Sequence, residues 1–343
     1  MKLLKLPYLV QKKVLKQMMY EELFLMSFLS KRSMRMVQSV KRKEIMKIEI
    51  YIWGAFYRFS AGSDKRAIVT LYQESYPTDK ALRKSISLGN LACSMEYKQQ
   101  VLPHYPSLVI YSRFPETDTI ATIVDDQLSA LFGNYVIFEM SINDRYNVLP
   151  TFLNVTRTTM VFREPVNAHV LDDYFMNVQE QKYLNITIKE LIGNLSSNSK
   201  FYNTQKLEIK CTDRSLTTDI LSNFKGKELI LNAPSDIDNE ICQFVERWKS
   251  CQELKDFAFM QLVTGLPENT NIDDIKQKSG FKDLTPEADA FGKAPGTLVA
   301  SYPSYVVRDD GIIAKTFINK RLFLFYVQSF TEEQMLKGTE VTI

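Results

Sequence analysis

Few side chains in this 343-residue sequence have the types and spacing that acid–base or nucleophilic chemistry requires. It contains two histidines, His104 and His169, and no nearby serine, cysteine or carboxylate pattern suggests a nucleophile–base pair with either. Paired acids occur at Asp125-Asp126, Asp172-Asp173 and Asp273-Asp274. Adjacent residues on a helix point apart, so these pairs predict helix caps or solvated faces rather than catalytic dyads. An enzyme is therefore the least favoured class of function.

The cysteines predict neither a disulfide framework nor a zinc site. They are scattered, and no two form a Cys-x-x-Cys pair: Cys93, Cys211, Cys242 and Cys251. The sequence has no Walker loop and no Gly-x-Gly-x-x-Gly motif. We therefore expect reduced thiols, no cofactor and no bound metal.

The composition, with 45% hydrophobic and 24% charged residues, is typical of a soluble globular protein with room for two or three domains. No window reaches the length of a transmembrane helix, and lysines interrupt any signal-peptide core, so a cytoplasmic or nuclear location is expected. Lysines concentrate near the N-terminus, on the predicted outer faces of helices, which favours a solvated face over a nucleic-acid site. Trp53 and Trp248 are interpreted as core anchors, with ligand stacking as the alternative.

The N-terminal stretch, residues 6–43, predicts three short helices. On the first, Val10, Val14, Leu15 and Met18 share one face. The second, over residues 23–29, is apolar all round and must be covered on every side, yet it is too short to span a bilayer. Such a small unit rarely builds a sufficient core alone, so the second helix is expected to need a partner.

LPYLVQKKVLKQMMYEELFLMSFLSKR, which begins at Leu6, resembles an F-box and fits its pattern without a gap. One departure is Ser33, where many F-boxes carry an aromatic residue. The resemblance implies docking to the Skp-type adaptor of a cullin-based ubiquitin ligase. The adaptor-binding residues that it implies are Leu6, Pro7, Val10, Val14, Leu15, Leu23, Lys31 and Arg32.

Two other interpretations of the N-terminal stretch remain open. It could be an ordinary amphipathic helical hairpin within a larger core. It could also be a mitochondrial presequence, because the first twenty residues are basic and lack acids. Against a presequence, those residues contain neither arginine nor serine, and Glu21 and Glu22 follow directly.

Past the N-terminal helices, residues 47–133 predict a small β-rich linker region. Ile48, Ile50 and Ile52 alternate with polar or aromatic residues, which is a strand signature. Further strands are predicted over 67–72 and 107–114, and a short helix over 118–132. Residues 75–106 show no sustained period.

From residue 134 a strand-like pair of apolar residues recurs about every 22 to 28 positions, the range of leucine-rich repeats. Helix-like stretches at 167–178, 217–224 and 236–248 separate some of the copies. A plain α/β sheet with helices on one face is the alternative. The pairs are Phe138/Met140, Met160/Phe162, Leu184/Ile186, Leu207/Ile209, Leu229/Leu231 and Phe257/Phe259.

The C-terminal part predicts a long excursion over 267–295, with one short helix, and then an antiparallel cap. Strands are predicted over 305–307, 312–318 and 322–327, and Asp310-Gly311 is a hairpin signal between the first two. DIDNEICQFVERWKSCQELKDFAFMQL and the later SYVVRDDGIIAKTFINKRLFLFYV resemble the F-box-associated type 2 domain. That family occurs behind the F-box in nematode-type F-box proteins.

The predicted fold is α+β or α/β: an F-box over 1–46, a β-rich region over 47–133 and a leucine-rich-repeat-like, F-box-associated domain over 134–343, closed by a β-hairpin. The predicted function is the substrate-recognition subunit of a Skp–cullin–F-box ubiquitin ligase, itself non-catalytic. A protein-interaction scaffold without a ubiquitin link is the alternative. The expected partners are the adaptor, a cullin through it, and an unknown target protein, with no membrane or nucleic acid.

The strands also predict where a target binds. If the paired apolar residues face the core, their neighbours must face outward, because strand side chains alternate. The set mixes charged and apolar side chains, which suits a protein surface, although a solvated sheet face is an equal alternative. The displayed residues are Glu208, Lys210, Glu228, Ile230, Asn232, Ala258 and Met260.

Overall fold

The computed structural model describes most of the chain, in two compact units. The first comprises residues 1–145 and 150–159, and the second comprises residues 146–149 and 160–343. Strand β8 (Val155–Phe162) contributes residues to both units. The described residues are 3–40, 47–54, 56–61, 66–73, 83–88, 90–98, 107–113, 116–133, 136–144, 148–211, 213–233, 237–264, 266, 270–285 and 302–337.

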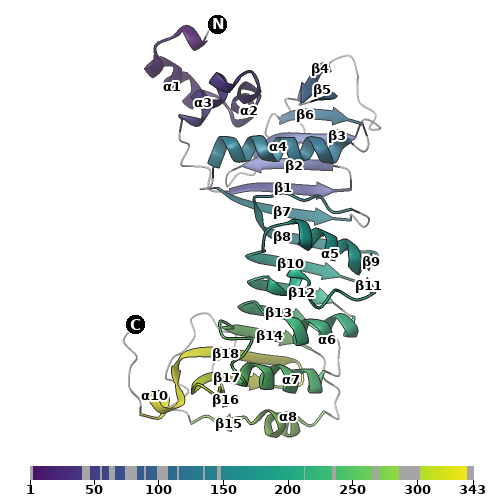
Figure 1. Ribbon diagram of the computed structural model, residues 1–343, viewed down its shortest axis with the longest axis vertical. Coiled ribbons are helices and arrows are strands. Elements are labelled where there is room, and N and C mark those ends of the chain that lie inside the picture. The colour runs from purple at the N-terminus through teal and green to yellow at the C-terminus, as the bar shows by residue number, and fades with distance from the viewer. Residues whose placement is uncertain are drawn as a thin grey trace. The chain divides into compact units, whose positions relative to one another are not determined.

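The first unit begins with the three predicted helices, preceded by the short turn η1 (Leu3–Lys5) (Figure 1). They are α1 (Tyr8–Gln17), α2 (Tyr20–Phe28) and α3 (Lys31–Gln38). Each start has a local cause. Pro7 precedes α1, where its missing N–H costs no helical bond. Glu22 Oε2 accepts from the Met19 N–H at 2.8 Å at the start of α2, and Ser30 Oγ accepts from the Ser33 N–H at 3.0 Å in α3.

Helix α2 receives much of its cover from its own chain. It contacts α3, helix α4 (Glu116–Phe132) and strand β3 (Arg66–Gln73), and Phe24 is buried. Gln127 Nε2 of α4 donates to Ser27 Oγ at 2.5 Å, and Gln38 Nε2 of α3 donates to the Ala130 carbonyl at 2.6 Å. The partner that the all-apolar second helix needs is therefore supplied largely by α4 and the sheet beneath it.

The sheet of the first unit has the strand order β7-β1-β2-β3-β6-β5-β4. Strand β1 pairs antiparallel with β2 and parallel with β7, and β3 pairs parallel with β6. The predicted strands over 67–72 and 107–114 and the predicted helix over 118–132 are confirmed. The remaining bounds are β1 (Lys47–Trp53), β2 (Phe56–Ala61), β4 (Lys84–Leu88), β5 (Leu91–Lys98), β6 (Ser107–Ser112) and β7 (Ile137–Asn143).

One face of this sheet packs against α4. Ile48, Ile50 and Ile52 are buried on that face, and Tyr57, the β2 partner of Ile52, donates to Asp118 Oδ1 of α4 at 2.6 Å. Strand alternation then directs Glu49, Tyr51 and Trp53 to the opposite face. Trp53 is 59% exposed, so its predicted role as a core anchor is wrong.

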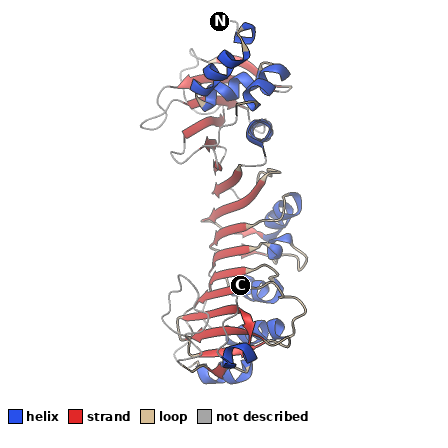
Figure 2. Ribbon diagram, turned by 90° about the vertical axis from the view of Figure 1, so that its left-hand side faces the viewer, coloured by secondary structure: helices blue, strands red, loops and turns tan. Residues whose placement is uncertain are grey.

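The second unit consists of successive strand–helix units with parallel strands. Strands β10, β12, β13 and β14 pair in that order, and helices lie on one side of them (Figure 2). The buried apolar pairs of β10, β12 and β13 face these helices, as predicted. The bounds are β10 (Tyr183–Ile188), β12 (Lys206–Cys211), β13 (Glu228–Asn232), β14 (Phe259–Val263), α5 (Ala168–Asn177), η4 (Lys200–Asn203), α6 (Arg214–Asn223) and α7 (Asp238–Lys249), with β9 (Val166–Asn167) pairing β11 (Leu191–Ile192) beside them.

The last predicted pair, Phe257/Phe259, lies three positions before the buried pair of the strand. Strand β14 begins at Phe259, and its buried residues are Met260 and Leu262, which align with Leu229 and Leu231 of β13. A turn precedes the strand, in which the Phe257 N–H donates to the Leu254 carbonyl at 3.2 Å. Phe257 is buried in this turn rather than in the strand, so the apolar residues of this copy do not keep the period of the earlier ones.

The C-terminal part adds antiparallel strands in the order β14-β18-β17-β16-β15, as the hairpin signal predicts. Gly311 has a φ of +86° at the hairpin, a conformation that favours glycine. Most of the predicted excursion over 267–295 lies outside the described residues. The bounds are α8 (Ile272–Ser279), β15 (Lys282–Asp283), β16 (Ser304–Val307), β17 (Ile312–Ile318), β18 (Leu322–Thr331) and α10 (Glu332–Lys337).

Candidate functional site

Four consecutive residues at the start of α1 are exposed, and we call them the α1 strip: Pro7, Tyr8, Leu9 and Val10. Leu9 is 73% exposed, and Leu29, at the end of α2, is 76% exposed. Exposed apolar side chains do not stabilise a folded monomer. Clusters of them on the surface mark protein-interaction sites. The α1 strip is therefore the strongest candidate docking element among the described N-terminal helices.

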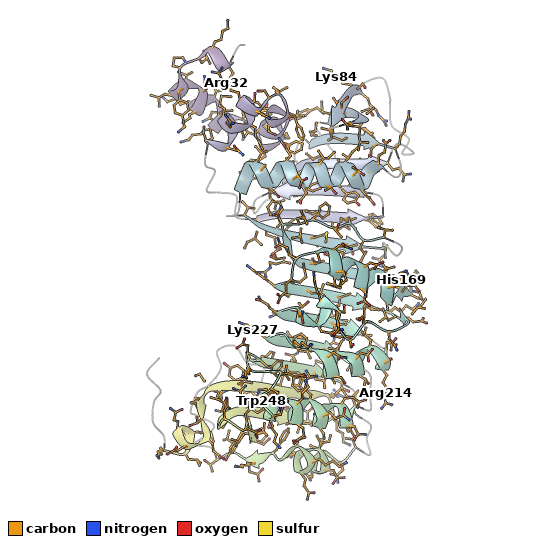
Figure 3. All side chains as sticks on the ribbon, viewed as in Figure 1. Arg32, Lys84, His169, Arg214, Lys227 and Trp248 are labelled. Atoms are coloured by element: carbon orange, nitrogen blue, oxygen red, sulfur yellow. The ribbon has the colours of Figure 1, made fainter. Side chains whose placement is uncertain are left out.

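The predicted adaptor-binding residues divide into accessible and buried groups. Pro7, Val10, Lys31 and Arg32 are exposed, and Figure 3 labels Arg32 on the N-terminal helices. Leu6 and Val14 are half-buried.

Leu15 and Leu23 require a correction, because both side chains are buried within the first unit and offer no surface to a partner. They hold α1 and α2 in the helical core. Sequence reasoning missed Tyr8, Leu9 and Leu29. A signal for the α1 strip was available, since three successive apolar residues on a helix span about 200° and cannot all face inward.

Basic side chains border the exposed apolar residues. Lys12 Nζ lies 4.7 Å from the centre of the Tyr8 ring, and hydrogen bonds from Lys12 and Ser39 lower the pKa of the Tyr8 hydroxyl. Lys31 and Arg32 are exposed on α3. Apolar contact within a cationic border suits docking of a protein with acidic groups around an apolar patch.

Five of the predicted target-binding residues lie on the face of the second unit's strands opposite the buried pairs: Glu208, Lys210, Glu228, Ile230 and Asn232. There the charged side chains pair with one another. Lys206 Nζ lies 3.0 Å from Glu228 and 3.6 Å from Glu208, and Tyr183 Oη donates to Glu208 Oε2 at 3.0 Å. Lys210 is exposed at the end of this row.

The remaining members of that predicted set are less accessible. Ile230, Asn232 and Ala258 are only partly exposed. Met260 requires a correction, because it is fully buried and points to the helix side. Gln261 takes the outward position in register with Ile230.

The described residues hold little that resembles a catalytic centre. A cavity of about 240 Å³ in the first unit is lined by polar residues that include Ser94, Arg113 and Glu116. Burial raises the pKa of the Cys93 thiol at its wall to about 11, so this thiol is protonated at neutral pH and is a poor nucleophile. His169 is exposed, and His104 lies outside the described residues.

The residues that the structure describes form neither a metal-ligand cluster nor a membrane-spanning helix. They contain no group of three or more His, Cys, Asp or Glu side chains placed to hold a metal ion. No helix among them is long and apolar enough to cross a bilayer.

One acid departs from the prediction that the paired acids are caps or solvated. Asp125 of α4 is 1% exposed, and its Oδ1 has no hydrogen-bond partner among the described residues. Burial, with a smaller contribution from the neighbouring Asp126, raises the pKa of the Asp125 carboxyl to about 7. The prediction was wrong because α4 is covered on more than one side, by the sheet and by the N-terminal helices.

Replacing Asp125 with Asn is expected to stabilise the protein increasingly as the pH rises. The folded pKa of about 7 lies above the unfolded value of about 3.9, so the acid's contribution to folding is fully present below pH 4 and is lost as the pH rises toward 7. Urea unfolding at pH 4.5, 6 and 8 should show a difference in the free energy of unfolding that grows by up to about 1.4 kcal/mol per pH unit. Asp126→Asn, at an exposed neighbour, is the matched control. Parallel pH profiles for wild type and Asp125→Asn would contradict a buried, protonated Asp125.

These features describe a small unit of three short helices that carries an exposed apolar strip. The family model of the F-box domain matches residues 3–45. No curated protein and no solved structure matches the chain. The chain therefore carries an F-box domain at residues 3–45, which contains α1, α2 and α3.

Proposed function

We propose that this chain is the substrate-recognition subunit of an SCF-type ubiquitin ligase. The F-box docks a Skp-type adaptor, the adaptor connects the chain to a cullin, and the remainder of the chain holds a target protein. The chain itself performs no chemistry. The observation that carries the proposal is the F-box domain at residues 3–45, with the α1 strip exposed on it.

The finer features predicted from the sequence belong to this proposal. They are the nematode-type F-box family, the F-box-associated type 2 domain, the leucine-rich-repeat-like character of the strand–helix units and the division at residues 46 and 133. The location in the cytoplasm or nucleus is also part of it. Parallel strands with helices on one side support a repeat architecture, in which each unit buries its apolar face against the next.

Adaptor docking through the α1 strip is expected to depend strongly on Leu9. A leucine that is exposed in the free chain adds apolar area to a complex, and central apolar anchors dominate the binding energy of most interfaces. Leu9→Glu, alone and combined with Pro7→Ala, should weaken binding to a purified Skp-type adaptor by on the order of 2 kcal/mol or more, roughly 30-fold. Isothermal titration calorimetry measures this change directly.

The matched control is Leu336→Glu on α10, where the replaced leucine is 69% exposed but lies outside the F-box. Both variants remove an exposed leucine and add one negative charge, so only the position differs. Circular dichroism establishes that each variant is folded. Wild-type adaptor affinity in the folded Leu9→Glu/Pro7→Ala protein would refute docking through this strip.

The rival proposal is an interaction scaffold without a ubiquitin link. The two differ in one measurable property, because a scaffold whose N-terminal helices only complete the fold has no affinity for the adaptor. The close packing of α2 against α4 is the observation that favours the rival, since it gives the helices a structural role. Failure of the wild-type chain to bind any Skp-type adaptor would favour the scaffold.

A further inference from the structure

The face of the first unit's sheet opposite α4 carries exposed aromatic residues. Trp53 is 59% and Tyr51 is 40% exposed, both on β1, and each lies beside a β7 residue in register. Trp53 stands at the end of β1, next to Gly54. Tryptophan and tyrosine are rarely left exposed on a strand, and they are enriched among the residues that dominate protein interfaces.

Further aromatic rings on the same face support Tyr51. The Tyr51 ring meets Phe56 of β2 edge-on at 6.4 Å, and Phe56 meets Tyr72 of β3 at 4.9 Å. Tyr72 stacks on Tyr111 of β6 at 5.9 Å, and the Arg83 guanidinium lies 3.6 Å from the centre of the Tyr111 ring. This row crosses four strands, so the rings hold one another in place and little side-chain entropy is lost when a ligand binds.

Four of the charged residues beside this aromatic face neutralise one another. Lys47 Nζ pairs with Glu49 at 2.8 Å and also with Glu139 of β7, and Arg157 Nε lies 3.0 Å from Glu139. Two cations and two acids therefore form one closed network. The face also carries cations outside this network, because Arg58 of β2 lies in register with Tyr51 and Arg83 covers the Tyr111 ring.

Hydrogen-bonding side chains lie directly beside the exposed rings. Ser141 of β7 aligns with Tyr51, and Asn143 aligns with Trp53. Neither side chain makes a hydrogen bond with any described residue. A hydroxyl and a carboxamide next to flat apolar rings match the amide groups and aliphatic side chains of a peptide.

We propose that Tyr51, Trp53 and Phe56, with Ser141 and Asn143, form the surface on which the target is held, and that the ligand is an extended peptide segment rich in proline or aliphatic residues. Such a segment stacks an apolar side chain on the Trp53 indole and offers its backbone amides to Asn143 and Ser141. This inference rests on the proposed role in target recognition and names the chemistry recognised. It locates the target surface on the first unit rather than on the strands around Glu208.

The test selects a library of random 12-residue peptides, displayed on phage, against the intact chain. We expect the enriched peptides to carry proline or aliphatic residues. A synthetic copy of one should bind the chain in fluorescence anisotropy, and Trp53→Ala should weaken binding at least tenfold. Tyr51→Ala, expected to weaken it about threefold to tenfold, keeps the test valid if Trp53→Ala does not fold.

Two matched controls separate this inference from the proposed function. Tyr8→Ala removes a comparably exposed aromatic residue from the α1 strip, so it should leave peptide affinity unchanged, while Trp53→Ala should leave adaptor affinity unchanged. The double variant Glu208→Lys/Lys210→Glu should also bind the peptide normally. If the wild-type chain bound the peptide but failed to bind the adaptor, only the proposed link to the ubiquitin ligase would be refuted.

Three outcomes would overturn the peptide surface. The selection could enrich no peptide. The enriched peptides could bind Trp53→Ala and Tyr51→Ala as tightly as wild type, or lose affinity in the Glu208→Lys/Lys210→Glu protein instead. Finally, a fluorescent 20-nucleotide oligothymidine could bind in a Trp53-dependent manner where no peptide does, which would make the aromatic face a nucleic-acid platform.

Discussion

Replacing Gly226 with Ala is expected to cost on the order of 4 kcal/mol or more, and to leave much of the protein unfolded. A Cβ at this position would lie 1.9 Å from the backbone oxygen of Thr204 and 2.5 Å from Cζ of Phe224. The first of these atoms cannot move alone, because the neighbouring residues tie the two segments together. The Lys225 N–H donates to the Tyr202 carbonyl at 2.9 Å, and the Lys227 N–H donates to the Gln205 carbonyl at 2.7 Å.

Urea unfolding, followed by Trp248 fluorescence in a Trp53→Phe background, measures this cost in the second unit. The matched control is Gly193→Ala, where the backbone φ is +84° but the nearest atom to a new Cβ is 3.9 Å away. That control isolates conformational strain, worth about 1–2 kcal/mol. If Gly226→Ala cost no more than Gly193→Ala, the close approach of the two segments would not exist in solution.

Much of the N-terminal architecture could be predicted from sequence because its signals are local. A proline before α1, acids at the start of α2 and a serine before α3 each act within one helical turn. What covers α2 could not be predicted. The contact of Gln127 with Ser27 joins residues 100 positions apart, and no periodicity connects them.

The two errors in the strands have different physical origins. Strand side chains alternate, so an error of one residue in where a strand begins reverses every inward and outward assignment. For β14 the turn before Phe259 produced that reversal, which placed Met260 in the core. For Trp53 the alternation itself holds, since Ile48, Ile50 and Ile52 are buried, but the predicted core role followed from the size and hydrophobicity of the side chain and not from the alternation. Because side chains alternate along β1, Trp53 points away from the face on which Ile52 is buried.

For the candidate site too, part could be predicted from the sequence and part could not. The family resemblance found the F-box, but it assigned surface roles to Leu15 and Leu23, which the packing of three helices places inside. Sequence alone could not show which turn of α1 stays exposed, because that depends on what lies beneath it. The aromatic rings of Tyr51, Phe56, Tyr72 and Tyr111 form a row across four strands of the first unit. This row could be recognised only once the register of the strands was known.

The C-terminal hairpin shows how a sequence motif can have a structural role. Arg308 is buried and holds three elements together. Its Nε and Nη2 donate to Asp310 at 3.0 and 2.8 Å, and its Nη1 donates to the Lys255 carbonyl at 3.2 Å. The guanidinium carbon also lies 5.3 Å from the centre of the Trp248 ring. The hairpin, the end of α7 and the turn before β14 therefore meet at one side chain.

Replacing Arg308 with Ala is accordingly expected to lower the free energy of unfolding by on the order of 3 kcal/mol, because it removes a buried hydrogen-bonded group and its packing on Trp248. Arg308→Lys should recover only part of this loss, since an ammonium cannot reproduce the two-pronged contact with Asp310. Urea unfolding monitored by circular dichroism provides the measurement. Arg321→Ala, at an exposed position before β18, should change stability by less than about 0.5 kcal/mol.

The dependence of this loss on pH distinguishes the ion pair from packing. The hydrogen bond from Arg308 lowers the pKa of the Asp310 carboxyl, so the pair contributes its stability above the unfolded pKa of about 3.9 and loses it as the pH falls through the lower folded value. The difference between wild type and Arg308→Ala should therefore shrink below pH 4. A difference that stays constant from pH 7 to pH 3 would assign the whole effect to packing against Trp248, because only the carboxylate responds to acid in this range.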